Sequence, residues 1–194
     1  MGGRAEPAGR KPSAAEVLAR LRELADPRLR AMQARFGIPT EKSLGLRFPP
    51  IQKLAREIGR DHKLAQQLWD SGIHEARHLA FLVAEPARMS ESQMERWARE
   101  FDSWDVVDGT CLYLFLYTPF AWKKAIAWSR RKEEFVKRAS FSLMAYLAVH
   151  DKQAPGAKFE RLLPIIQREA GDARNFVKKA VNWALRQIGK RNLR

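Results

Sequence analysis

The chain is divided into many short helical segments, and this division most constrains its fold. Segments with apolar residues at helical spacing are separated by Gly, Pro and polar pairs, and no stretch shows the alternation of a half-buried strand. Ser13 and Ser90 each precede Glu or Gln by three residues, which is the capping-box pattern that begins a helix. Helices are predicted at 13–24, 26–35, 50–58, 62–70, 73–84, 91–100, 104–117, 119–129, 133–150, 157–169 and 172–190, with a loop at 37–49.

One segment of the chain repeats 41 positions later. Phe-Val-Lys-Arg-Ala at 135–139 recurs as Phe-Val-Lys-Lys-Ala at 176–180. Helix pairs that repeat at roughly 40–47 residues are typical of HEAT and armadillo proteins, and stacked pairs form a curved solenoid. The predicted fold is therefore all-α: a right-handed solenoid of HEAT-like repeats over residues 13–194, with a concave basic face.

The chain is strongly basic. Its 36 Lys and Arg residues exceed its 22 Asp and Glu residues, which gives a formal net charge of +14. A field of this sign attracts polyanions, namely DNA, RNA or an anionic membrane surface. No apolar run approaches the roughly 20 residues that a membrane span requires, so the sequence favours a nucleic acid over a membrane.

The N-terminal residues and the cysteine content bear on organisation and compartment. Residues 1–12 are rich in Gly, Pro and Arg and lack the apolar centre of a secretory signal, so we expect a disordered basic arm. The single cysteine, Cys111, cannot form an internal disulfide and excludes cysteine-based zinc sites. We expect a monomeric, cytoplasmic protein, associated with the nucleoid if its source is bacterial.

Asp108 is the first candidate for chemistry. It is the only charged residue between Asp105 and Lys123, and on a helix it shares a face with Trp104. A carboxylate in apolar surroundings is costly unless a cation or a hydrogen-bond donor meets it. Two interpretations remain open: a buried structural ion pair or cap, or a carboxylate that meets a cationic ligand or transition state.

The last predicted helix carries a tryptophan among cations. Trp183 lies at the edge of the apolar stripe, beside Lys179, Arg186 and Lys190. This pattern suits a surface that meets nucleic acid, and it equally suits a tryptophan that closes the core beneath long basic side chains. Arg138 lies off the apolar stripe of its own helix, where a guanidinium can clamp a phosphate or pair with a carboxylate such as that of Asp108.

One segment matches the zinc-protease motif H-E-x-x-H. On a helix, His74 and His78 share a face, and Glu75 takes the place of the general base. A third ligand is required, for which Glu95 and Glu100 are the candidates, while the arginine inside the motif places a cation beside any metal. Packing roles for both histidines are the alternative. Because a strongly basic helical solenoid is a poor setting for a metalloprotease, we predict no metal.

Other kinds of catalytic site are not indicated. His62 and His150 have no Ser or Cys nucleophile arrangement around them, and Cys111 lies among apolar neighbours. The sequence contains no glycine-rich phosphate loop. Any chemistry is therefore expected to use carboxylate, aromatic and basic groups without a cofactor.

Four segments together resemble the DNA alkylation repair proteins, the AlkD-like alkylpurine DNA glycosylases built of HEAT-like repeats. The likeness spans roughly residue 31 to the C-terminus. One of the segments, at 68–77, covers the first four residues of the H-E-x-x-H motif, and the resemblance in that region accounts for the motif without a metal. The segments are Leu-Trp-Asp-Ser-Gly-Ile-His-Glu-Ala-Arg at 68–77, Ser-Trp-Asp-Val-Val-Asp at 103–108, Phe-Val-Lys-Arg-Ala at 135–139 and Phe-Val-Lys-Lys-Ala-Val-Asn-Trp-Ala-Leu-Arg at 176–186.

The resemblance implies a role for each matching residue. Asp108 takes the position of the catalytic carboxylate, Trp104 and Trp183 those of two aromatic cleft residues, and Arg138 that of a phosphate-binding arginine. The implied reaction is hydrolysis of the N-glycosidic bond of purines alkylated at position 3 or 7 in double-stranded DNA, through an oxocarbenium-like transition state. Further cations expected at the DNA are Arg131, Lys137, Lys178, Lys179, Arg186 and Lys190.

The chain departs from the family at both ends. The aromatic-rich N-terminal helix of the best-known members is replaced here by Arg-Ala-Met-Gln-Ala-Arg at 30–35. Longer members continue with further helices after the Trp183 helix, so we expect a weaker grip on DNA there. Some relatives bind branched DNA without excising bases. A non-catalytic binder of branched or damaged DNA is therefore the alternative function, and a helical scaffold for acidic protein partners is a third.

Overall fold

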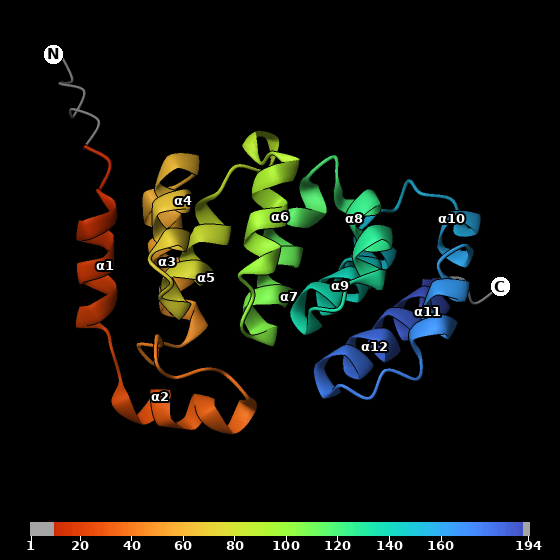
Figure 1. The fold of residues 1–194 in the computed structure, drawn as a ribbon. Helices are drawn as coiled ribbons and strands as arrows, with labels where there is room; N and C mark the ends of the chain where they lie inside the picture. The colour runs from red at the N-terminus through yellow and green to blue at the C-terminus, as the bar shows by residue number, and fades with distance from the viewer. Residues whose placement is uncertain (1–9, 192–194) are drawn as a thin grey trace, which may run out of the picture.

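The protein is a row of packed helices that runs from α1 at one end to α10–α12 at the other (Figure 1). The computed structural model describes residues 10–191, so most of the predicted disordered arm lies outside the described residues. Within that range the regular structure is helical, as predicted. The elements are α1 Ala14–Glu23, α2 Pro27–Gln33, η1 Ala34–Phe36, α3 Phe48–Ile58, α4 His62–Asp70, α5 His74–Val83, η2 Pro86–Arg88, α6 Glu91–Arg99, α7 Trp104–Tyr113, η3 Phe115–Tyr117, α8 Ala121–Ala127, η4 Trp128–Arg130, α9 Glu134–His150, α10 Gly156–Glu160, α11 Leu163–Glu169 and α12 Asn175–Arg191.

The helix ends follow local chemistry. Both predicted capping boxes are present, because the Ser13 and Ser90 hydroxyls accept from the backbone N–H three residues on and the side chains at those positions accept in return. The predicted helix at 157–169 is wrong as a single element. Pro164 lies in the first turn of a new helix, α11, because proline lacks the N–H that a helix interior requires.

The helix predicted at 119–129 also begins later than expected. The Thr118 hydroxyl donates to the carbonyl of Phe115 at 2.8 Å, so it closes the preceding 3₁₀ turn instead of capping α8. The first helical residue of α8 is Ala121, two positions beyond Pro119. Thr118 and Pro119 therefore mark a turn between two helical elements.

The internal repeat corresponds to two helices that pack against each other. Its two copies lie in the first halves of α9 and α12, and the rings of Phe135 and Phe176 have centroids 5.5 Å apart. Equivalent positions of successive helical units therefore meet, as in a HEAT-like stack. The contact also brings the N-terminal turns of α9 and α12 beside each other.

One continuous apolar core joins the α-helices from α1 to α12 except α2, which buries no residue. Large aromatic residues fill its middle, where Trp69 of α4 and Trp97 of α6 stack with centroids 3.9 Å apart. At one site the backbone itself is close-packed, because a Cβ on Gly109 of α7 would lie 2.3 Å from Cζ of Phe81. Glycine there lets α7 approach α5 closely.

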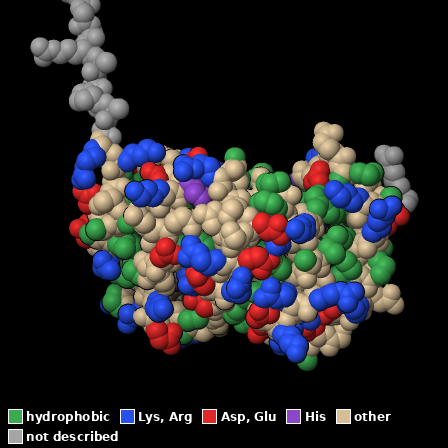
Figure 2. Space-filling model, turned by 45° about the horizontal axis from the view of Figure 1, so that its top comes forward, with side chains coloured by type: hydrophobic (Ala, Val, Ile, Leu, Met, Phe, Trp, Pro, Cys, Tyr) green, Lys and Arg blue, Asp and Glu red, His purple; other side chains and the backbone are tan. Residues whose placement is uncertain are grey.

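The surface carries charges of both signs on the face drawn in Figure 2. Lys and Arg side chains are spread over it and are interspersed with Asp and Glu. This face is therefore not uniformly basic. Among the described residues, no helix combines the length and the apolar character that crossing a bilayer requires.

Candidate functional site

A basic cleft opens where four elements of the chain converge. It has a volume of about 500 Å³, and its wall combines cations and aromatic rings without a carboxylate. The cleft lies at the end of η1, at the start of α7 and along the first two turns of α9 and α12. The lining residues are Arg35, Phe36, Gly37, Trp104, Arg138, Asn175, Phe176 and Lys179.

Asp108 lies directly behind the cleft wall, in contact with Arg138. Arg138 donates from Nε to Oδ1 at 3.0 Å and from Nη2 to Oδ2 at 2.6 Å, and the hydroxyl of Ser142 donates to Oδ1 at 2.8 Å. The third nitrogen of Arg138, Nη1, donates to the carbonyl of Phe176 at 2.8 Å. The Asp108 side chain is 17% exposed and that of Arg138 is 8% exposed, so the pair is largely dry.

These contacts bear on the protonation of Asp108. Burial raises the pKa of the Asp108 carboxyl above its ordinary value, and the Arg138 guanidinium and the Ser142 hydroxyl oppose that rise. The structure thus contains the buried ion pair that the sequence left as one interpretation. It also leaves the carboxylate one side chain away from the cleft.

Trp104 lines the cleft on the other side of Arg138. The guanidinium carbon of Arg138 lies 5.9 Å from the centroid of the Trp104 ring, and the indole N–H donates to the carbonyl of Phe36 at 3.0 Å. The next residue, Gly37, has a φ of 74°, and a Cβ there would lie 2.8 Å from Cζ of Phe176. Glycine at this position therefore lets η1 close against α12 and complete the cleft.

Trp183 is not among the residues that line this cleft. It lies on α12 one turn beyond Lys179, partly buried, with its ring edge-on to Tyr146 at a centroid distance of 4.8 Å. The two tryptophans expected at one cleft therefore occupy different environments, and a role for Trp183 in binding the sugar stays a prediction.

The six cations expected at DNA fall into two groups. Lys178, Lys179, Arg186 and Lys190 are exposed on α12, and Lys179 lines the cleft. Lys137 is different, because its side chain is 12% exposed and its Nζ lies 2.6 Å from Glu169 and 3.2 Å from Asp172.

Arg131 resembles Lys137 in this respect. Its guanidinium pairs with Glu95 and with Glu133. The charges of Arg131 and Lys137 are thus compensated within the protein, which does not favour a phosphate contact by either residue. The four α12 cations remain the stronger candidates.

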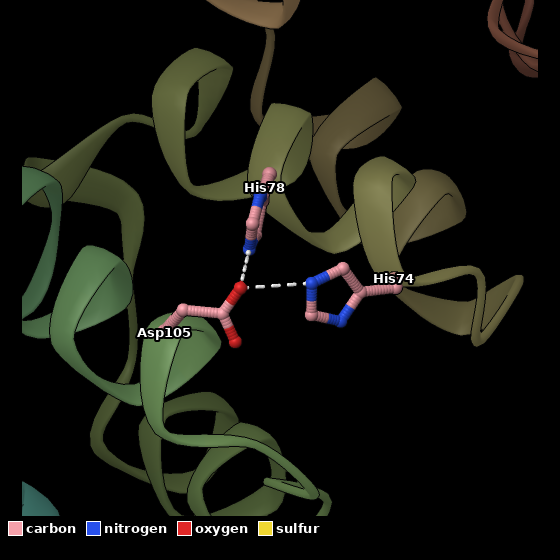
Figure 3. A group of neighbouring side chains, drawn as sticks. All are labelled: His74, His78 and Asp105. Atoms are coloured by element: carbon pink, nitrogen blue, oxygen red, sulfur yellow. Dashed lines mark hydrogen bonds and ion pairs between the residues drawn. The ribbon is translucent and has the colours of Figure 1, made fainter. Parts of the chain in front are cut away.

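The two histidines of the H-E-x-x-H motif form a cluster with Asp105, a carboxylate that the sequence did not indicate as their partner (Figure 3). Asp105, in the first turn of α7, lies with its Oδ2 2.9 Å from Nε2 of His74 and 3.3 Å from Nε2 of His78. The predicted third ligands are engaged elsewhere: Glu95 pairs with Lys124, and Glu100 accepts the indole N–H of Trp69.

The proton balance of this cluster follows from its contacts. Burial alone would lower the pKa of His74, but its hydrogen bond to Asp105 raises that pKa above the ordinary value. Burial alone would raise the pKa of Asp105, but the two histidines hold it far below its usual range. The cluster thus favours a charged carboxylate facing imidazole nitrogens.

Glu75 does not have the role that the zinc-protease motif assigns to it. Its fully buried carboxylate accepts the backbone N–H groups of Leu44, Gly45 and Leu46 at 2.8, 2.8 and 3.1 Å. Burial alone would raise the pKa of Glu75, but the backbone N–H groups of Leu44 and Leu46 lower it below its ordinary value. Glu75 therefore holds the loop before α3 and is not a general base.

Several residues of the site could not be found from the sequence. The carbonyls of Phe36 and Phe176 and the hydroxyl of Ser142 orient the side chains by contacts over 30 or more positions. The only sequence signal for the η1 wall is the basic segment at 30–35, which contains Arg35.

Comparison with known proteins gives a family and a fold. The family model described as "DNA alkylation repair enzyme" matches residues 17–194. A solved structure described as "a new family of proteins related to the HEAT-like repeat DNA glycosylases with affinity for branched DNA structures" superposes with a TM-score of 0.83 at 21% identity, over 92% of this chain and 76% of that chain. No curated protein matches the sequence.

Proposed function

Because this chain belongs to the DNA alkylation repair enzyme family, we propose that it is a DNA glycosylase that removes purines alkylated at N3 or N7. The observation that carries the proposal is a largely buried carboxylate, Asp108, held beside a cleft lined by Arg35, Arg138 and Lys179. A cation-lined cleft suits the DNA backbone, and a dry carboxylate suits a substrate that becomes cationic.

Binding is assigned to the cleft and to the exposed face of α12. Phosphates of a duplex contact Lys179 and Arg138 in the cleft, and Arg186 and Lys190 extend the contact along the same helix. Trp104 presents an aromatic surface to the deoxyribose between these phosphates. Trp183 is assigned a second sugar contact farther along α12.

The chemistry requires little acid catalysis. An N3- or N7-alkylated purine carries a positive charge, so it leaves as a neutral base when the bond to C1′ breaks. The sugar becomes oxocarbenium-like, and the electrostatic attraction of a carboxylate is strong where water is excluded. Asp108 supplies that charge and orients the water that attacks C1′, and the proton lost by the water passes to the carboxylate or to solvent.

Arg138 connects binding to chemistry in this proposal. In the absence of DNA, its guanidinium neutralises Asp108 through two hydrogen bonds. A phosphate in the cleft competes for the same guanidinium, because phosphate and carboxylate both accept its planar donors. Binding of the backbone thereby weakens the hold of Arg138 on Asp108 and frees the carboxylate for the sugar.

The alternative function is binding of branched DNA without excision. The observation that favours it is the same ion pair, since a carboxylate that stays neutralised by Arg138 cannot stabilise a developing cation. The structurally similar protein is described as having affinity for branched DNA structures, and this chain shares its fold. In this case the cleft cations bind phosphates and Asp108 serves only to orient Arg138.

Two assays on the wild-type protein decide between these functions. Excision is measured as release of 7-methylguanine and 3-methyladenine from methylated duplex DNA, and binding is measured on a four-way junction and on a duplex of the same sequence at one salt concentration. We expect release of free base in an amount that rises with time. Absence of release, together with tighter binding to the junction than to the duplex, would contradict the glycosylase proposal and support the alternative.

A further inference from the structure

Three side chains from two helices converge on one point beneath the surface, between α5 and α7 (Figure 3). His74 and His78 lie four residues apart on α5 and so share a face, and Asp105 reaches them from the first turn of α7. One ring nitrogen from each histidine and one carboxylate oxygen all lie within 4.8 Å of one another. None of these three residues takes part in the site around Asp108.

The hydrogen bonds of the described residues do not fully account for this convergence. Nε2 of His74 makes a hydrogen bond with Oδ2 of Asp105 at 2.9 Å. Nε2 of His78 points at the same oxygen from 3.3 Å, yet it is shielded from solvent and makes no hydrogen bond within residues 10–191. A buried ring nitrogen left in this state costs free energy unless another group meets it.

We propose that His74, His78 and Asp105 bind a divalent transition-metal ion, with zinc as the expected occupant. Two imidazole nitrogens and one carboxylate oxygen form a donor set that zinc accepts. In a tetrahedral zinc site, ligand atoms bound at 2.0–2.1 Å lie about 3.3 Å apart, close to the two distances from Asp105. The Asp105 side chain is 20% exposed, so the cluster can be reached from solvent on that side.

The charges around the cluster are compatible with a cation. Arg77, the cation inside the motif, is turned away, because its Nη1 donates to Asp102 and to the carbonyl of Glu100. Its charge is therefore compensated at a different point. Asp105 supplies one negative charge to the ion.

The assigned role of the ion is structural. Glu75, which would act as the base in a zinc protease, is bound to the loop at 44–46 and is not free to activate a water. The ion instead links α5 to the start of α7, next to Trp104 and one turn before Asp108. Binding it would stabilise the segment that carries the proposed catalytic residues.

Direct metal binding tests the proposal. The full chain, prepared without a histidine tag and stripped with a chelator, is titrated with Co²⁺ while the visible absorption of four-coordinate cobalt is recorded, and Zn²⁺ is then added as competitor. We expect one equivalent to bind and Zn²⁺ to displace it. His74→Gln and His78→Gln are each expected to weaken binding at least 100-fold, whereas His150→Gln, a matched change at an exposed histidine, keeps wild-type affinity.

Thermal unfolding gives a second measurement that does not depend on the variants. A hundredfold excess of free Zn²⁺ over its Kd is expected to raise the Tm of the wild type by about 5–10 °C. Absence of stoichiometric binding to the wild type, or binding that survives His78→Gln in a folded protein, would overturn the proposal. Neither result bears on excision of alkylated bases.

Discussion

Asp105 and Asp108 lie three positions apart on α7, yet the two ends of this short stretch have opposite electrostatic settings. Asp105 faces the imidazoles of α5, which hold its pKa far below the usual range although its burial alone would raise it. Asp108 faces α9, where burial raises its pKa against the opposing effects of Arg138 and Ser142. The same residue type on one helix thus serves two regions, and the partner across the helix contact decides what each carboxylate can do.

On the side of α7 that faces α5, the charged groups make contacts within the protein that stabilise the fold. Glu75 ties down a loop through three backbone N–H groups, and Asp105 gathers two histidines. The α9 side is built around an arginine that faces a cleft. We therefore expect changes on the α5 side to affect stability, and changes on the α9 side to affect both stability and chemistry.

The largest expected change in stability comes from Arg138→Ala. Removing the guanidinium leaves the Asp108 carboxylate buried without its cation, which is expected to lower the free energy of unfolding by about 3–5 kcal/mol. Urea unfolding measures this loss. Arg186→Ala, at an exposed position, is the control and is expected to change stability by less than about 0.5 kcal/mol. Equal stability of the two variants would show that the Asp108–Arg138 ion pair is not shielded from solvent as the structure indicates.

Glu75→Gln is expected to cost about 2–3 kcal/mol, because a neutral amide replaces a charged acceptor of three backbone N–H groups. The matched control is Glu57→Gln, whose parent carboxylate pairs with Arg20 in solvent and contributes little. Urea unfolding of the two variants compares them directly. If Glu75→Gln lowers the free energy of unfolding no more than Glu57→Gln does, the contacts of Glu75 do not stabilise the fold as proposed.

Acid is expected to remove the stabilising effect of Glu75 and Asp105, as it does for every carboxylate whose pKa is lowered by folding. The unfolded chain protonates Glu and Asp near their ordinary pKa values of about 4, whereas folded Glu75 and Asp105, whose pKa values are lowered, stay ionised to lower pH. Their stabilising effect is therefore complete above those ordinary pKa values and is lost progressively as the pH falls below them toward the lowered pKa values of the folded state.

The contribution of Asp108 to stability changes with pH in the opposite direction, because its pKa is raised in the folded state. Unfolding in urea at about pH 6 and about pH 3.5 is thus expected to show a smaller acid-induced loss for Glu75→Gln than for the wild type. Asp108→Asn should not reduce that loss. An unchanged acid-induced loss in Glu75→Gln would show that its contacts do not contribute to acid sensitivity.

The smallest expected effect separates the cations predicted to bind DNA. Lys179→Ala is expected to reduce the slope of log Kd against log salt by about 0.9, the value for one phosphate contact with duplex DNA. Lys137→Ala is expected to leave the slope unchanged, since Lys137 is paired with Glu169 and Asp172. Affinity measured at several salt concentrations tests both. A reduced slope for Lys137→Ala would show that its ion pairs open on binding.

The sequence predicted features that depend on local pattern. The all-helical fold and the capping boxes at Ser13 and Ser90 follow from residues close together in the chain. The internal repeat predicted stacked helical units, and its two copies lie in α9 and α12, which pack against each other. The prediction of a single helix at 157–169 was wrong. Its apolar residues follow a helical spacing throughout, but the chain forms two helices there, and Pro164 lies in the first turn of the second.

The site was predicted less completely, for a different reason. Asp108, Trp104 and Arg138 could be selected by type and resemblance, and the structure brings them together. Their orientation depends on Ser142 and on the carbonyl of Phe36, which act across distant parts of the chain. Asp105 was missed as a partner of His74 because only tertiary packing brings α7 to α5.

The most direct test of the proposed chemistry is single-turnover release of 7-methylguanine by Asp108→Asn, with protein in excess over methylated duplex. Asp102→Asn is the matched control, because Asp102 is an exposed carboxylate just before the same helix. We expect Asp108→Asn to bind duplex DNA as tightly as the wild type but to release base at least about 100-fold more slowly, while Asp102→Asn stays within about threefold of the wild-type rate. Release by Asp108→Asn at the wild-type rate would contradict a catalytic role for the carboxylate.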